Sequence, residues 1–318
     1  MKWKKLGKIF NPTEHTLTNN CFEFAQSPQA LVFDNFVRIY FSTREKDAKG
    51  KYLSHISFVD MDKKFKQVLN VSSKTVIPLG ELGCFDEHGI FPISIFKNDN
   101  QLLAYTTGWN RKVSVSADAS IGLAVSNDNG LTFEKTGNGP ILTSSLNEPF
   151  LVGDAFVAVF EKTYHMWYIY GSKWISDSKE SDPQRVYKIV HATSADGIAW
   201  EKEGKHIISD KLDENECQAL PTIIKQKNKY HMFFCYRHAT GFRKNKERGY
   251  RIGYAYSTDL QTWTRDDANA GIDVSEGEWD SDMMCYPNIF ACDENIYLLY
   301  NGNEFGRLGF GIAILEDK

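Results

Sequence analysis

The sequence YHMWYIYGS at residues 164–172 returns as YHMFFCYRH at residues 230–238, 66 positions further along the chain. Each copy lies in a longer unit. The unit begins with proline, or with alanine in one copy, and continues through an apolar run, a short polar turn and a second apolar run. Three further segments have the same order, so the chain contains five copies of one unit. The residues that align them are Pro28, Pro92, Ala155, Pro221 and Pro287, at intervals of 64, 63, 66 and 66 residues.

A second motif recurs in phase with the first. A strand-like run ends in serine, aspartate follows two residues later, and an aromatic residue then opens another run. The clear copies are IGLAVSNDNGLTFEK from Ile121, IVHATSADGIAWEK from Ile189 and IGYAYSTDLQTWTR from Ile252. We expect Asp128, Asp196 and Asp259 to hydrogen-bond the backbone of their own turns.

Each unit therefore carries four strand signals and almost no helical periodicity. Four-stranded sheets repeated radially form a β-propeller. The predicted fold is all-β: a five-bladed β-propeller with four-stranded blades, in which residues 1–318 form a single domain. A solenoid is the alternative, but it would need polar caps at both ends.

The two ends of the chain favour the ring. The fifth copy stops at GFGIAILEDK, one strand short, whereas WKKLGKIF at residues 3–10 aligns with WEKEGKHI at residues 200–207. We therefore predict that the N-terminal strand pairs into the last blade. This pairing would close the ring and remove two exposed sheet edges.

Composition excludes several classes of function. With a net charge of −4, the chain lacks the excess of positive charge that attracts nucleic acid. No apolar stretch reaches the roughly 18 residues that a membrane helix needs. The basic start is not followed by the apolar run of a secretory signal, so a cytoplasmic protein is expected. Six cysteines without a CxxC pair predict free, buried thiols rather than a zinc site. The oligomeric state is left open.

Acidic residues recur ahead of the first strand of each unit. Five positions before the aligning residue stand Glu23, Glu87, Phe150, Glu216 and Asp282, and the third unit has Glu148 and Asp154 close by. If the first strands surround a central channel, these carboxylates converge near one mouth of it. Crowded carboxylates perturb each other's pKa values, which favours a functional role; the alternative is that they cap turns or lie in solvent.

Polar and aromatic residues follow the second strands. Arg44 and Arg237 occupy the same repeat position, and arginine binds carboxylates, phosphates and sugar hydroxyls in a fixed geometry. Their alternative role is a salt bridge within the acidic cluster, and for the aromatic candidates it is packing. Three long polar loops at residues 108–120, 171–188 and 236–250 are expected to build the rim of the site. Further candidates are Trp109, Trp174 and Tyr286, which could stack on a sugar, and His15, His88, His238, Asn301 and Asn303.

These motifs carry a resemblance. The turns SADGIAWEKEG and STDLQTWTRDD, and the blade openings FDEHGIFPISIF, ALPTIIKQKNKYHMFFCYR and YPNIFACDENIYLLYNGN, resemble the five-bladed propeller glycosidases of families 43, 32, 68, 62 and 130. The resemblance covers nearly the whole chain and implies catalysis by three carboxylates, on blades one, two and three. The chain departs from that pattern: no carboxylate adjoins Pro28, and the acids of the second unit lie five and six residues before Pro92.

The resulting prediction is a carbohydrate-active enzyme, similar to a glycoside hydrolase, that cleaves a glycosidic bond by acid/base catalysis. Glu216 is predicted as the acid, Asp86 or Glu87 as the base, and Asp282 as the third carboxylate. The predicted substrate-binding residues are His15, Arg44, His88, Trp109, Asp154, Arg237, His238, Tyr286 and Asn301. Of these, Arg44 and Arg237 would grip the substrate and His88 would relay a proton.

The alternatives are a glycoside phosphorylase, with Arg44, Arg237 and His238 binding phosphate, a sugar transferase acting on intracellular glycan precursors, and a non-catalytic carbohydrate-binding propeller. The expected partner is a small-molecule or oligosaccharide substrate, with neither nucleic acid nor membrane. No cofactor and no metal site are predicted, although the resemblance allows a structural calcium in the channel.

Overall fold

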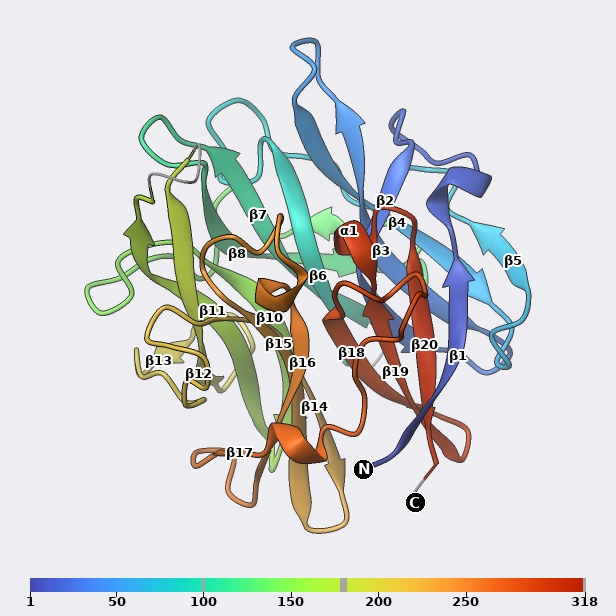
Figure 1. Ribbon diagram of the computed structural model, residues 1–318. Helices are drawn as coiled ribbons and strands as arrows, with labels where there is room; N and C mark the ends of the chain where they lie inside the picture. The colour runs from blue at the N-terminus through green and yellow to red at the C-terminus, as the bar shows by residue number, and fades with distance from the viewer. Residues whose placement is uncertain (99–100, 178–181, 317–318) are drawn as a thin grey trace.

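The computed structural model describes residues 1–98, 101–177 and 182–316. Runs rich in β-branched and aromatic residues form its strands, which suit a pleated, half-buried surface. In the described residues the strands fall into sets of four antiparallel neighbours (Figure 1). The first two sets are β2 (Glu23–Val32), β3 (Val37–Lys46), β4 (Tyr52–Met61) and β5 (Val68–Val71), then β6 (Gly89–Asn98), β7 (Gln101–Arg111), β8 (Ala117–Ser126) and β9 (Glu134–Lys135).

The remaining sets repeat this arrangement. They are β10 (Val152–Phe160), β11 (Thr163–Ile175), β12 (Gln184–Ser194) and β13 (Glu201–Lys202); β14 (Cys217–Gln226), β15 (Lys229–Arg237), β16 (Arg251–Ser257) and β17 (Thr264–Arg265); and β18 (Cys285–Cys292), β19 (Asn295–Asn301), β20 (Phe310–Leu315) and β1 (Trp3–Phe10). Only short helices interrupt them in the described chain: η1 (Pro12–Glu14), η2 (Lys246–Arg248), η3 (Asp267–Asn269) and α1 (Asn303–Gly306). The prediction of an all-β protein with several four-stranded sheets is confirmed. The last three sets are separate sheets, whereas the first two are joined by one parallel bridge between Ser54 in β4 and Gly89 in β6.

The N-terminal strand lies where the repeat alignment predicts it. β1 pairs antiparallel with β20, with Trp3 opposite Leu315 and Phe10 opposite Phe310. Figure 1 shows the two strands side by side, with both chain termini at the same end of the sheet. The fourth strand of the last set therefore comes from the start of the chain.

The first strands of the sets lie against one another. β2 contacts β6, β6 contacts β10, β10 contacts β14, β14 contacts β18, and β18 contacts β2. Large side chains fill the spaces between neighbouring sheets, among them the fully buried Tyr40, Tyr105, Trp167 and Phe233. The high aromatic content of the sequence is thus used mainly in packing the sheets face to face.

Each first strand is interrupted by a bulge at the aligning residue. The register shifts between Gln26 and Gln29, Ile90 and Ile93, Gly153 and Phe156, Ala219 and Thr222, and Cys285 and Asn288. In four of the five bulges the residue before the aligning position has a positive φ: Ser27, Asp154, Leu220 and Tyr286. A bulge re-aims the side chain that it carries, so this position is directed differently from the rest of the strand.

The predicted turn aspartates are confirmed. Asp128, Asp196 and Asp259 each accept a hydrogen bond from the serine two residues earlier, at 2.7, 3.0 and 3.0 Å, and from backbone N–H groups that follow. All six cysteines are free, and all except Cys84 are buried. Among the described residues, no helix is long and apolar enough to span a membrane.

Candidate functional site

A cavity of about 540 Å³ lies at the ends of the first strands. All five of these strands contribute to its lining, and three of the residues that precede the aligning position reach it: Phe91, Asp154 and Tyr286. The bulges therefore do more than end the regular pairing, because they deliver side chains to a shared central space. The same region is lined by the three long loops expected to form the rim, through Asp118, Arg185, Tyr187, Arg237, Phe242, Arg243 and Tyr250.

Asp154 is the one strongly buried carboxyl group among the described residues that line this cavity, with 8% of the residue exposed. Its backbone N–H donates a 2.8 Å hydrogen bond to Oγ1 of Thr107 in β7, which fixes the bulge to the neighbouring sheet. Burial raises the pKa of Asp154 to about 7, against the opposing attraction of Arg185 and a hydrogen bond from the backbone of Leu220. A substantial fraction of this carboxyl is therefore protonated near neutral pH.

Four arginines line the same cavity: Arg44, Arg185, Arg237 and Arg243. The Arg44 guanidinium donates to Oγ of Ser42 at 2.8 Å and to Oε1 of Gln26, all neutral partners. Burial lowers the pKa of Arg44 to about 10. Partial burial, followed by repulsion from Arg237 and Arg185, lowers the pKa of Arg243. The second carboxylate of the lining, Asp118, forms an ion pair of 3.1 Å with Lys112.

Arg237 is held in an aromatic cage. Its guanidinium lies 3.6 Å from the centre of the Phe242 ring and donates from Nη2 to the Tyr187 hydroxyl at 2.8 Å. The Tyr187 hydroxyl is also hydrogen-bonded to the hydroxyl of Tyr250. Although Arg237 is only 3% exposed, its Nε has no hydrogen-bond partner among the described residues. The Arg237 side chain is therefore fixed in place and charged, and it keeps one N–H donor without a hydrogen bond.

Five of the predicted site residues line the cavity: Arg44, Trp109, Asp154, Arg237 and Tyr286. Trp109 is oriented by a 3.1 Å hydrogen bond from its Nε1 to Oγ of Ser54. Their substrate-binding roles stay predictions, whereas their gathering in one place is a finding. The four predicted catalytic carboxylates, Glu216, Asp86, Glu87 and Asp282, are absent from the lining.

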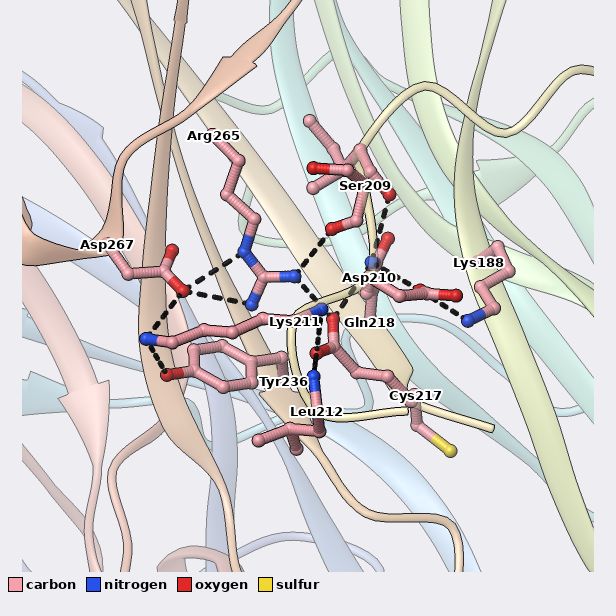
Figure 2. A network of polar contacts seen from close by, with 12 residues as sticks. Lys188, Ser209, Asp210, Lys211, Leu212, Cys217, Gln218, Tyr236, Arg265 and Asp267 are labelled. Atoms are coloured by element: carbon pink, nitrogen blue, oxygen red, sulfur yellow. Dashed lines mark hydrogen bonds and ion pairs between the residues drawn. The ribbon is translucent and has the colours of Figure 1, made fainter. Parts of the chain in front are cut away.

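Glu216 is a buried structural residue in the fold, so the prediction that it faces the funnel needs correction. Its carboxylate forms an ion pair of 2.6 Å with Arg265 and accepts 2.9 Å hydrogen bonds from the backbone N–H groups of Lys211 and Leu212. Figure 2 shows Arg265 between Asp267 on one side and the loop of Ser209, Asp210 and Lys211 on the other. With the residue 0% exposed, no substrate can reach the carboxylate as it stands.

This ion pair recurs in four of the five sets. In each, a buried acid that precedes the first strand meets a cation on the outermost strand of the same set. The pairs are Asp86 with Lys135 at 2.6 Å, Glu148 with Lys202 at 2.5 Å, Glu216 with Arg265 at 2.6 Å, and Asp280 with Lys5 at 2.6 Å. These four acids therefore hold the outer strand of each sheet to its entry loop, so the placement of Asp86 at the funnel is corrected as well. Of the acids that recur five positions before the aligning residue, only Glu216 belongs to such a pair.

The other two predicted catalytic carboxylates also lie outside the cavity lining. Glu87 accepts a hydrogen bond from the backbone N–H of Gly83 and lies 3.2 Å from Nδ1 of His88. Asp282 is exposed, and its backbone N–H donates to Oδ1 of Asn303 at 2.8 Å. Both residues belong to the loops before the first strands, which end short of the cavity.

Four predicted binding residues have other surroundings. His15 stacks on Phe10 with ring centres 5.0 Å apart, and His238 pairs with Asp213 at 3.1 Å. Asn301 is fully buried and bridges strands by accepting from the Ser27 N–H and donating to the Ala25 carbonyl. None of these lines the cavity. His88 also lies outside the lining but stacks on Trp109, which belongs to it.

Sequence reasoning did not single out Arg185, Arg243 or Asp118. All three lie in the long loops that were expected to form the rim, but nothing in their local pattern separates them from the other charged residues there. The described residues include no group of three or more His, Cys, Asp or Glu side chains placed to hold a metal ion. The structural calcium stays a prediction.

Comparison with known proteins places the fold. No protein-family model matches the chain. It is 33% identical to the uncharacterized proteins MT1551 and Rv1502 of Mycobacterium tuberculosis, strains CDC 1551 / Oshkosh and ATCC 25618 / H37Rv, over 318 residues and the full length of each protein.

Solved structures share the architecture at low sequence identity. A glycoside hydrolase has a TM-score of 0.75 at 16% identity, covering 99% of this chain and 93% of its own. A thermostable family-43 glycoside hydrolase has a TM-score of 0.65 at 15% identity, covering 95% and 94%. The β-1,2-mannobiose phosphorylase of Listeria innocua has 0.68 at 13%, covering 98% and 95%. The predicted resemblance to the propeller glycosidases is confirmed for the fold.

Proposed function

This chain belongs to the family of the two mycobacterial proteins, and we propose that it is a carbohydrate-active enzyme that cleaves or transfers a glycosidic bond in the central cavity. Asp154 is the proton donor in this proposal. Its buried carboxyl, with a pKa raised to about 7, is the observation that carries the assignment. The shared fold of glycoside hydrolases and a glycoside phosphorylase supports the same class of chemistry.

The five sets of strands are, in this proposal, the blades of a closed β-propeller. The cyclic contacts of β2, β6, β10, β14 and β18 support a ring. The pairing of β1 with β20, together with the Lys5–Asp280 ion pair that matches those of three other sets, supports closure through the N-terminal strand. The cavity then lies on the central axis, where every blade contributes to the lining.

The proposed reaction begins with Asp154 in its protonated form. Its carboxyl donates the proton to the oxygen of the leaving group as the glycosidic bond breaks, which is the role of a general acid with a raised pKa. The carboxylate that remains is stabilised by the Arg185 guanidinium, whose attraction favours the ionised form. Thr107 keeps the bulge in place while the charge changes.

The group that attacks the anomeric carbon distinguishes two versions of the proposal. In hydrolysis, Asp118 acts as the base that activates water, since it is the other carboxylate of the described lining. In phosphorolysis or transfer, an anionic acceptor attacks directly and no second carboxylate is required. The ion pair between Asp118 and Lys112 favours the second version, because the carboxylate that would activate water already has a charged partner.

The test compares wild type with Asp154→Asn on a panel of aryl glycosides and oligosaccharides, with and without phosphate. Asparagine preserves the shape of the side chain and tolerates the positive φ of 56° at this position. We expect turnover to fall by at least about 100-fold, in line with general acid catalysis, while sugar binding persists. Undiminished turnover in Asp154→Asn would refute the assignment, and sugar binding without turnover in wild type would indicate a non-catalytic propeller.

The same panel separates hydrolysis from phosphorolysis. Asp118→Asn should slow a hydrolase strongly and a phosphorylase little, and only a phosphorylase requires added phosphate. Activity confined to nucleotide-activated sugars would identify a transferase.

A further inference from the structure

The arginines of this chain are used in two different ways. Five of the ten, all outside the cavity lining, form ion pairs with carboxylates: Arg38, Arg111, Arg251, Arg265 and Arg307. In the described part of the chain, none of the four that line the cavity forms such a pair. Of these four, Arg237 is buried, Arg44 and Arg185 are half-buried and Arg243 is exposed. A charged group that is taken out of water usually has a partner of opposite charge, so the buried Arg237, beside three other guanidinium groups without such a partner, requires an explanation.

The charge of the cavity is strongly one-sided. Arg44, Arg185, Arg237 and Arg243 contribute four positive charges, since arginine stays protonated in proteins. Against them stand Asp154, which is partly protonated near neutral pH, and Asp118, which already pairs with Lys112 at 3.1 Å. The protein as a whole is acidic, with a net charge of −4, so this positive region is local.

Three of the guanidinium groups act on one another. Arg243 is repelled by both Arg237 and Arg185, which places all three within electrostatic reach in the same part of the lining. Arg237 is 3% exposed and keeps an Nε without a hydrogen-bond partner in the described chain. Water reaches the exposed Arg243 and the half-buried Arg185, whereas the buried Arg237 depends on partners within the cavity. A bound anion would relieve it.

We infer that the cavity binds its ligand through an oxyanion, a carboxylate or a phosphate, that Arg185, Arg237 and Arg243 hold together. The planar fork of arginine matches both groups, and charge-assisted hydrogen bonds of this kind are about twice as strong as neutral ones. The inference rests on the proposed function and specifies an anionic reactant for it, either an acidic saccharide or a phosphate co-substrate.

The remaining walls suit a sugar ring. Phe24, Phe91, Trp109 and Tyr286 provide apolar faces, and the volume of about 540 Å³ lies within the usual range for a small-molecule site. Arg44 lies over the rings of Phe24 and Phe91, at 5.7 and 5.2 Å from their centres. The same cavity thus offers arginines for the anion and aromatic faces for the ring.

The test is calorimetric titration of the purified protein with four probes: glucose, glucuronic acid, glucose 1-phosphate and inorganic phosphate. We expect the anionic probes to bind at least about tenfold more tightly than glucose, and their affinity to fall as salt rises from 0.05 to 0.5 M, because salt screens charge. Tighter binding of an acidic sugar than of phosphate would assign the oxyanion to the substrate. The reverse order would assign it to a free phosphate co-substrate, and both orders uphold the oxyanion site.

Matched variants make the assignment specific. Arg243→Gln and Arg185→Gln should each weaken anion binding about tenfold, equivalent to about 1.4 kcal/mol, while Arg243→Lys keeps most of it. Lys244→Gln removes one exposed positive charge next to Arg243 but outside the lining, and should change nothing. Equal affinity for glucose and the anions, or arginine variants with wild-type affinity, would overturn the inference.

Failure of the oxyanion site and failure of the proposed enzymatic function would give different results. Anion binding that persists in Asp154→Asn, in a protein without any turnover, would uphold the oxyanion site and contradict the enzyme. Turnover of neutral glycosides that requires Asp154 but not Arg185 or Arg243 would uphold the enzyme and contradict the oxyanion site.

Discussion

Lys5 in β1 forms an ion pair of 2.6 Å with the buried Asp280, although 275 positions separate them in the chain. The same relation joins Asp86 to Lys135 and Glu216 to Arg265 within their own sheets. The N-terminal strand therefore carries the cation that the last sheet lacks. This contact makes the start of the chain part of the fold rather than an appendage.

Lys5→Met should destabilise the protein by about 3 kcal/mol, because it leaves Asp280 buried without a counter-charge. Urea denaturation measures the effect, with Lys4→Met as the control, since Lys4 is exposed in the same strand. Equal stability of the two variants would contradict a structural role for β1.

Trp3 provides a second test of the same strand. Trp3→Ala should cost about 3–5 kcal/mol, because the indole is 7% exposed, packs edge-on against Phe233 and donates to the Ala270 carbonyl at 3.0 Å. Leu6→Ala, at a position 44% exposed in β1, should have little effect. A melting temperature unchanged by Trp3→Ala would show that β1 is dispensable.

Glu216→Gln separates stability from chemistry. Because the carboxylate neutralises Arg265 in the interior, its replacement should lower the free energy of unfolding by about 3–5 kcal/mol while the turnover of the folded fraction stays unchanged. Thermal denaturation and kcat, corrected for the folded fraction, measure the two effects. If Glu216→Gln were as stable as wild type but lost kcat, Glu216 would have a catalytic role after all.

Thr107 is a positioning residue for Asp154. Thr107→Val leaves the Asp154 N–H buried without its 2.8 Å partner, so the bulge should shift and kcat should fall about tenfold. The pH at which activity declines should move as well, which a purely structural loss would not cause. Thr107→Ser keeps the hydroxyl and should restore both values; failure of serine to do so would argue against positioning.

Burial of Asp154 should appear in the pH dependence of stability. Its pKa is about 7 in the folded protein and near 3.8 in the unfolded chain, so the folded state binds the proton more tightly between these values. The stability contribution of the neutral form is complete below pH 4 and is lost as the pH rises through 7.

Asp154→Asn should consequently be more stable than wild type by about 2–4 kcal/mol at pH 8, with the difference disappearing toward pH 4. Urea denaturation at both pH values measures this difference. A variant less stable than wild type at pH 8 would contradict a destabilising buried carboxylate at that position.

The repeats, the strand order and the turn aspartates could be predicted because period and turn chemistry are local properties of the sequence. Pairing of β1 with β20 could also be predicted, since Trp3 and Lys5 occupy the repeat positions of Trp200 and Lys202. The same alignment was misleading for the acids. Glu216 and Asp86 each form an ion pair with the outermost strand of their own set, and an ion-pair partner about 50 residues away is invisible in the local pattern.

The position that reaches the cavity is the residue directly before the aligning one, as at Asp154 and Tyr286. Its direction depends on a bulge, and the sequence before a proline gives little indication of a positive φ, which most residues avoid there. Arg237 was predicted as a binding residue, but the grouping of three arginines could not be predicted for another reason. Arg237 and Arg243 lie in one loop and Arg185 in another, and only the folded chain brings the two loops together.

The most direct test of the central claim is a carbon-13 NMR titration of the aspartate carboxyl groups between pH 3 and pH 9, in wild type and in Asp154→Asn. We predict one aspartate that titrates near pH 7 in wild type and whose signal is missing from the variant. If every aspartate titrated below about pH 5, Asp154 would be ionised at neutral pH and could not serve as the proton donor.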